Sequence, residues 1–150
     1  FGGWDLPSDL CKRADLVARA DALAVPMGGD LPTRPAAARA KGPSFVVSAL
    51  RDPGIAAHPG GLLQRVQIVK GWVDAEEKLH QVVYDVAGGA NDASVDPATC
   101  TPRGAGHESL CAVWTDPEFD AAKSAVYYVR VLENPSCRWT ARQCLEFEAG

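Results

Sequence analysis

The sequence predicts a mainly β protein, an antiparallel β-sandwich-like domain with a short N-terminal helical segment and a C-terminal helical turn. In several runs apolar and polar residues alternate with a period of two, proline or glycine ends the runs, and turn-forming residues fill the stretches between them. The clearest run begins at residue 125 and ends at Asn134-Pro135, because proline cannot donate to a sheet ladder. In this run one face carries Val126, Tyr128, Arg130 and Leu132, and the other Tyr127, Val129 and Val131.

The chain divides by composition into a helical and loop lead-in, residues 1–43, and a β-sandwich-like domain, residues 44–150. In the lead-in, Ser8 or Asp9 can cap a short helix that extends to about Ala24, before Pro26. Residues 33–41 are rich in alanine, proline and arginine and lack a strong period, which predicts an exposed linker.

The second region contains four further strand-like runs, which we place at residues 45–50, 66–72, 82–86 and 110–114. The polar stretch 74–78 is short enough to join the second and third runs as a hairpin. Residues 88–106 form a long, turn-rich connection. Five strands with partly polar outer faces favour a sandwich of antiparallel sheets, with a turn-helix segment following the last strand.

The composition excludes some classes of function. The chain has 150 residues and a net charge of −4, with a pI of about 5.3, which argues against a nucleic-acid-binding surface. No run of about 18 apolar residues is present, so we expect no membrane span. The first residue is Phe1, with no basic-then-apolar leader, so we expect a cut end or the first ordered residue there.

The cysteines favour disulfides over a metal site. The chain has no Cys-x-x-Cys pair and its three histidines are scattered, whereas structural zinc usually takes closely spaced ligand pairs. Cys100 and Cys111 bracket a Pro/Gly-rich loop, whose closure would stabilise the fold by about 3 kcal/mol. Cys137 and Cys144 bracket the turn-helix segment, which leaves Cys11 to a partner outside this chain. Disulfides favour a periplasmic or secreted protein; buried free thiols are the alternative.

Several segments together resemble a known family. These segments are the last strand run with the residues that follow it, 125–139, the N-terminal Phe1-Gly2-Gly3-Trp4-Asp5, and four segments between them, residues 25–31, 48–53, 67–74 and 83–87. In this order, and over nearly all of the chain, these segments resemble a bacterial family known only as domain of unknown function 3604.

The resemblance implies a role within a larger protein. Members of the family resemble metal-dependent hydrolases of the polymerase-and-histidinol-phosphatase superfamily, in which a metal-binding barrel precedes a region like this one. This chain would then be the C-terminal accessory domain of a secreted or periplasmic hydrolase of phosphate or sulfate esters. The N-terminal barrel would be its partner and would hold the divalent metal, with no cofactor and no catalysis in this region alone. The protein could also form a homo-oligomer.

The loop Met27-Gly28-Gly29-Asp30 is the candidate site that the sequence singles out. Paired glycines allow a backbone to approach a ligand or another domain closely, and Asp30 could contact a metal or a polar substrate. The alternative is a helix-ending turn whose aspartate faces water. Because the segment matches the family, we expect it to pack against the barrel near its active-site mouth.

No catalytic or metal-ligating residue can be assigned in this chain. The Asn91-Asp92 and Asp96 stretch lacks the glycine and closing glutamate of an EF-hand, and no Gly-x-Ser-x-Gly elbow is present. The alternative function is a non-catalytic binding or interaction module. Its aromatic platform would use the four tryptophans, Trp4, Trp72, Trp114 and Trp139. For Trp72 and Trp114, packing in the core is the stronger interpretation.

Overall fold

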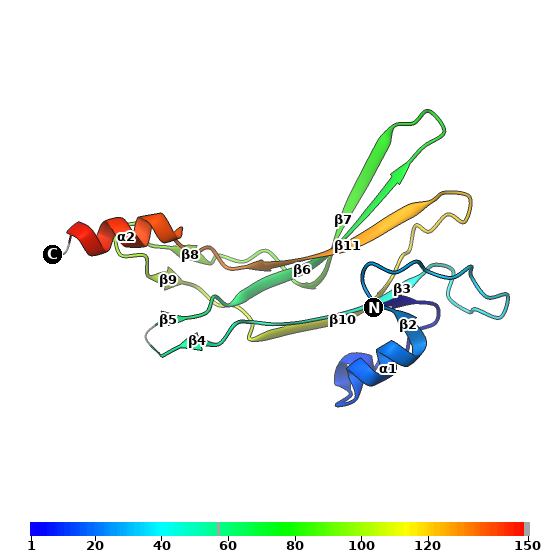
Figure 1. The fold of residues 1–150 in the computed structure, drawn as a ribbon, viewed down its shortest axis with the longest axis horizontal. Helices are drawn as coiled ribbons and strands as arrows, with labels where there is room; N and C mark the ends of the chain where they lie inside the picture. The colour runs from blue at the N-terminus through cyan, green and yellow to red at the C-terminus, as the bar shows by residue number, and fades with distance from the viewer. Residues whose placement is uncertain (57, 149–150) are drawn as a thin grey trace.

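The computed structural model describes residues 1–56 and 58–148 and confirms a mainly β, antiparallel protein with two α-helices. Figure 1 shows two sheets that lie one over the other, with helix α1 on the far side of the lower sheet. Helix α2 and the β6–β7 hairpin project at opposite ends of the molecule. Among the described residues, no helix is long and apolar enough to cross a membrane.

The upper sheet has three strands in the order β11-β6-β7. The strands are β6 (Leu63–Val73), β7 (Leu79–Gly88) and β11 (Ala125–Glu133). β6 is the central strand and pairs antiparallel with both neighbours, so Ile68 lies between Tyr84 and Val129. The turn between β6 and β7 spans residues 74–78, as predicted.

The lower sheet has four strands in the order β10-β3-β1-β2. β3 (Ser44–Leu50) and β10 (Ser109–Thr115) are the long pair, and β1 (Gly2–Gly3) and β2 (Ala24–Val25) extend the sheet. The lead-in therefore contributes two strands that the sequence did not predict. Gly2 has no side chain to show a period, and a Cβ there would lie 2.9 Å from the Phe45 ring. The strand therefore forms through close packing of its backbone against the Phe45 ring and not through an alternation of apolar and polar side chains.

The two sheets enclose the main core. Its fully buried members come from β3, β6 and β10, and the aromatic rings of Phe45, Trp114 and Tyr127 pack around them. Burial alternates along the outer strands β7 and β11, as expected for a sandwich, whereas the central strand β6 is buried without interruption over residues 66–70. The buried set is Val47, Leu63, Val66, Ile68 and Leu110.

A second, smaller core lies on the other face of the lower sheet. There Leu10 and Ala20, both without exposed surface, pack with Leu6 against Val46 of β3. The predicted single helix is instead a 3-10 turn, η1 (Leu10–Lys12), followed by α1 (Leu16–Leu23). Extended backbone at Arg13 separates them, so the helix begins later than Ser8 or Asp9 indicated.

The remaining elements are short and peripheral. β4 (Gly54–Ile55) pairs with β5 (His58–Pro59), and β8 (Ser94–Val95) pairs with β9 (Pro102–Arg103) inside the long connection 88–106. α2 (Trp139–Glu148) is the predicted C-terminal helical segment. The segment 33–41 has no regular structure and is mostly exposed.

The disulfide pairing differs from the pairs that the sequence spacing favoured. Cys11 is bonded to Cys111, across 100 residues, and Cys100 to Cys137, across 37 residues. Cys144 is exposed and unpaired within the described part of the chain. The prediction failed because it joined cysteines near in sequence, whereas the fold lays η1 against β10 and the 88–106 connection against the segment after β11.

We expect non-reducing peptide mapping to recover Cys11 linked to Cys111. Replacing both by serine should lower the free energy of unfolding by about 4 to 5 kcal/mol, because a long loop opens in the unfolded chain, and replacing Cys100 and Cys137 by about 4 kcal/mol. Cys144→Ser is the control and should leave urea unfolding unchanged. A peptide that links Cys100 to Cys111 would contradict the arrangement of the two cores.

Candidate functional site

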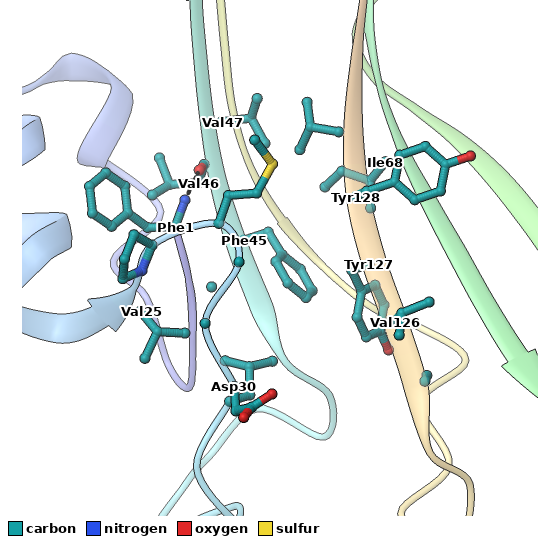
Figure 2. Close-up of a pocket in the computed structure, with 18 residues that line it drawn as sticks. Phe1, Val25, Asp30, Phe45, Val46, Val47, Ile68, Val126, Tyr127 and Tyr128 are labelled. Carbon is teal, nitrogen blue, oxygen red and sulfur yellow. Dashed lines mark hydrogen bonds between the residues drawn. The ribbon is translucent and has the colours of Figure 1, made fainter.

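A cleft of about 320 Å³ opens between the two sheets, beside the predicted loop. Apolar side chains from both sheets line it, among them Phe45 of β3 and Tyr127 of β11. Figure 2 shows the neighbouring rings of Phe45 and Tyr127, whose centroids lie 4.6 Å apart, and Asp30 at the end of the cleft away from Ile68. The structure thus places the predicted Met27-Gly28-Gly29-Asp30 loop on the wall of a cleft.

The loop is held at its base and open at its tip. Strand β2 anchors its start by pairing with β1, and the backbone N–H of Gly29 donates to the carbonyl of Pro26 at 3.1 Å. Gly28 has a φ of +92°, and a Cβ at this position would meet no atom within 4 Å, so conformation and not crowding requires glycine here. Met27 lines the cleft yet remains 76% exposed, and Asp30 is exposed.

A buried polar cluster lies next to this cleft. Lys70 of β6 donates from Nζ to Asp116 Oδ2 at 2.6 Å and to the carbonyl of Glu118 at 2.8 Å. Tyr127 donates its hydroxyl to the same Asp116 oxygen at 2.6 Å. The Asp116 side chain has no exposed surface and that of Lys70 is 8% exposed. This ion pair therefore sits in a low-dielectric interior, where each charge requires its partner.

The two tyrosines of this cluster remain protonated at neutral pH. Burial, and then the hydrogen bond to Asp116, raise the pKa of the Tyr127 hydroxyl. Burial and the hydrogen bond to Glu118, 2.6 Å from the hydroxyl, likewise raise the pKa of Tyr84. Both hydroxyls therefore act as hydrogen-bond donors that fix the two carboxylates and do not serve as bases.

The sequence analysis missed the role of Lys70 and Asp116. Lys70 occupies the inward face of its strand between Ile68 and Trp72, and a lysine at an apolar position of a strand is a detectable sign of a buried partner. For Asp116, the sequence indicates only the end of a strand before Pro117. Its partner comes from a strand 46 residues away, and no sequence spacing indicates that pairing.

The β6–β7 turn carries a second polar group. Asp74 accepts a hydrogen bond from the backbone N–H of Lys78 at 2.8 Å, and its other oxygen lies 2.6 Å from His80 Nε2. The His80 ring stacks on Trp72 with 5.3 Å between the ring centroids. The bond to His80, and then the bond from Lys78, hold the pKa of the Asp74 carboxyl below its usual value.

The four tryptophans do not form one platform. Trp114 packs in the core with Phe45 and Tyr84, and Trp4 lies edge-on to Phe119. Trp139 is 70% exposed on α2, which Figure 1 places at the end of the molecule away from the β6–β7 turn. Trp72, by contrast, lines a hollow together with polar groups.

The Asn91-Asp92 and Asp96 stretch is tied into the protein by hydrogen bonds. Asn91 accepts from the side chain of Gln64 and donates to Asn134, and Asp96 pairs with Arg103 at 2.6 Å. Within residues 1–56 and 58–148, histidine, cysteine and carboxylate side chains form no group of three that could hold a metal ion.

These features define a class: a disulfide-linked β-sandwich domain with an apolar cleft and a buried Lys–Asp pair beside it. The chain belongs to the family described as Protein of unknown function (DUF3604), whose model matches residues 1–150. Comparisons with curated proteins and with solved structures gave no match.

We expect Lys70→Met to lower the free energy of unfolding by about 3 to 5 kcal/mol, because Asp116 loses its cation in the interior. Lys123→Met is the matched control, since Lys123 pairs with Asp120 at 3.3 Å on the surface. This control substitution should lower the free energy of unfolding by less than about 1 kcal/mol. Equal losses in urea unfolding of the two variants would contradict a structural role for the buried pair.

The lowered pKa of Asp74 predicts a pH dependence of stability. The ionised carboxylate stabilises the fold above its unfolded pKa of about 4, and this contribution disappears as the pH falls through the lower folded value. The melting temperature of the wild type should therefore exceed that of Asp74→Asn above about pH 5 and converge with it in strong acid. Asp92→Asn, on an exposed loop, is the control, and a difference that does not depend on pH would refute the prediction.

Proposed function

We propose that this domain is the C-terminal accessory domain of a secreted or periplasmic metal-dependent hydrolase of phosphate or sulfate esters. The family resemblance supports the hydrolase part of the proposal. In this proposal the metal ligands belong to a preceding barrel, and the metal activates water and stabilises charge on the ester oxygens. The residues described above hold and shape the catalytic region and do not react.

The observation that carries the proposal is the exposed apolar surface at and beside the cleft. Met27, on the cleft wall, is 76% exposed, and Val126, on the outward face of β11, is 68% exposed. Exposed apolar side chains that lie near one another are typical of a surface that another protein segment covers. In this proposal the second domain packs against the predicted loop, with Asp30 near the contact.

The two disulfides support an extracellular or periplasmic setting, because such bonds persist in oxidising compartments. The disulfides also support the proposed role of this domain as a rigid support for the catalytic domain. Each joins elements distant in sequence, so the domain keeps its shape as a support for a catalytic partner.

The test is made on the full-length protein. We expect bound divalent metal and hydrolysis of an aryl phosphate, phosphonate or sulfate ester. Met27→Ser and Asp30→Ala should each lower kcat/KM by about tenfold or more, because a displaced domain shifts the site that it shapes. Ile55→Ser removes a similarly exposed apolar side chain elsewhere and is the control.

Absence of both metal and ester hydrolysis in the full-length protein would overturn the proposal. If Asp30→Ala leaves activity and stability unchanged while the enzyme is active, the loop has no role beside the active site.

A further inference from the structure

A second hollow, of about 330 Å³, shares Tyr127 with the first cleft as a lining residue. Aromatic rings of Trp72 and Phe119 line it together with the buried Lys70, and the exposed Asp120 and Lys123 form its rim. We propose that this hollow, the Trp72 pocket, binds one ring of a neutral sugar.

The pocket exists because a small residue lies beside a large one. In the register of β6 and β11, Trp72 pairs with Ala125, while on the other side it pairs with His80 of β7. His80 covers one face of the indole, stacked at an interplanar angle of 13°. Ala125 is too small to cover the rest of the indole, and Lys70 Nζ lies over the ring at 5.7 Å from its centroid, so part of the aromatic surface lines the pocket beside this ammonium group. Flat aromatic surfaces that are partly wet suit ligands with one apolar face and polar edges.

Both cations in and under the pocket already have a carboxylate partner. Lys70 pairs with Asp116 at 2.6 Å and Lys123 with Asp120 at 3.3 Å. Glu118, also in the lining, accepts the Tyr84 hydroxyl at 2.6 Å. With two cations and three carboxylates, the pocket has no surplus positive charge for a phosphate or sulfate, so the ester substrate of the proposed hydrolase is not its ligand.

The same charged groups can form hydrogen bonds with the hydroxyl groups of a sugar. The carboxylate oxygens of Asp120 and Glu118 accept hydrogen bonds, and the ammonium of Lys123 donates them, from exposed positions at the rim. A polyhydroxylated neutral ring brings both donors and acceptors and needs no counter-charge. The pocket volume lies in the lower part of the range for small-molecule sites, which suits a single ring.

The pocket is also preformed. The connection between β10 and β11 supplies Phe119, and the carbonyl of Glu118 and the side chain of Asp116 anchor this connection on Lys70. Trp4 packs edge-on against Phe119 from the other side, with 5.6 Å between ring centroids. A wall fixed in this way does not have to be ordered when a weak ligand binds, which lowers the cost of binding.

The experiment follows the indole N–H signals of the four tryptophans by NMR during titration with methyl glycosides of the common neutral pyranoses. The signal of Trp72, assigned with Trp72→Phe, should shift saturably at millimolar sugar, while those of Trp114 and Trp139 stay in place. Ala125→Leu fills the hollow and should weaken binding about tenfold or more. Ala98→Leu, on an exposed loop, is the matched control and should bind like the wild type.

Folding of each variant is checked from its amide spectrum, and Lys123→Ala offers a second, surface variant that should weaken binding without touching the strand. No shift of Trp72 with any neutral glycoside would overturn the proposal, as would binding that survives Ala125→Leu. Tighter binding of a sugar phosphate or an amino sugar than of the neutral glycosides would overturn the proposal that the ligand is a neutral sugar. These outcomes do not depend on whether the full-length protein hydrolyses esters.

Discussion

The buried pair of Lys70 and Asp116 is the interaction on which the arrangement of the two sheets depends. β10 belongs to the lower sheet and β11 to the upper one, and the connection between them starts at Asp116. By binding Lys70 at the centre of the upper sheet, Asp116 fixes how that connection crosses from one layer to the other. The backbone N–H of Asp116 also donates to the carbonyl of Pro43 at 3.0 Å, just before β3 begins. One residue thus ties together β3, β6 and the path to β11.

Tyr127 extends this constraint to the first cleft and the Trp72 pocket. Its hydroxyl binds Asp116, while its ring packs on Phe45 with 4.6 Å between centroids. Tyr127 lines both the first cleft and the Trp72 pocket. A rigid wall shared by two sites means that each keeps its shape when the other is filled. The proposed contact with a catalytic domain and the proposed sugar pocket are therefore compatible in one molecule.

The disulfides hold the parts that the main core does not reach. Cys11–Cys111 fastens η1 to the outer face of β10, beside the small core around Leu10. Cys100–Cys137 fastens the β8–β9 ribbon to the segment that leads into α2. Each bond closes a part of the protein with few buried apolar residues, where hydrophobic packing alone contributes little to stability.

The sequence by itself determined the positions of the five long strands, the β6–β7 hairpin and the family, because alternation along a strand and turn-forming residues are local signals. It also indicated the loop at Met27, which the fold places beside a cleft. Only the tertiary structure decided that Gly2 and Gly3 form a strand, that Cys11 pairs with Cys111, and that Asp116 meets Lys70. These are contacts between residues far apart in the chain, and their partners are set by how the layers pack, which no local pattern records.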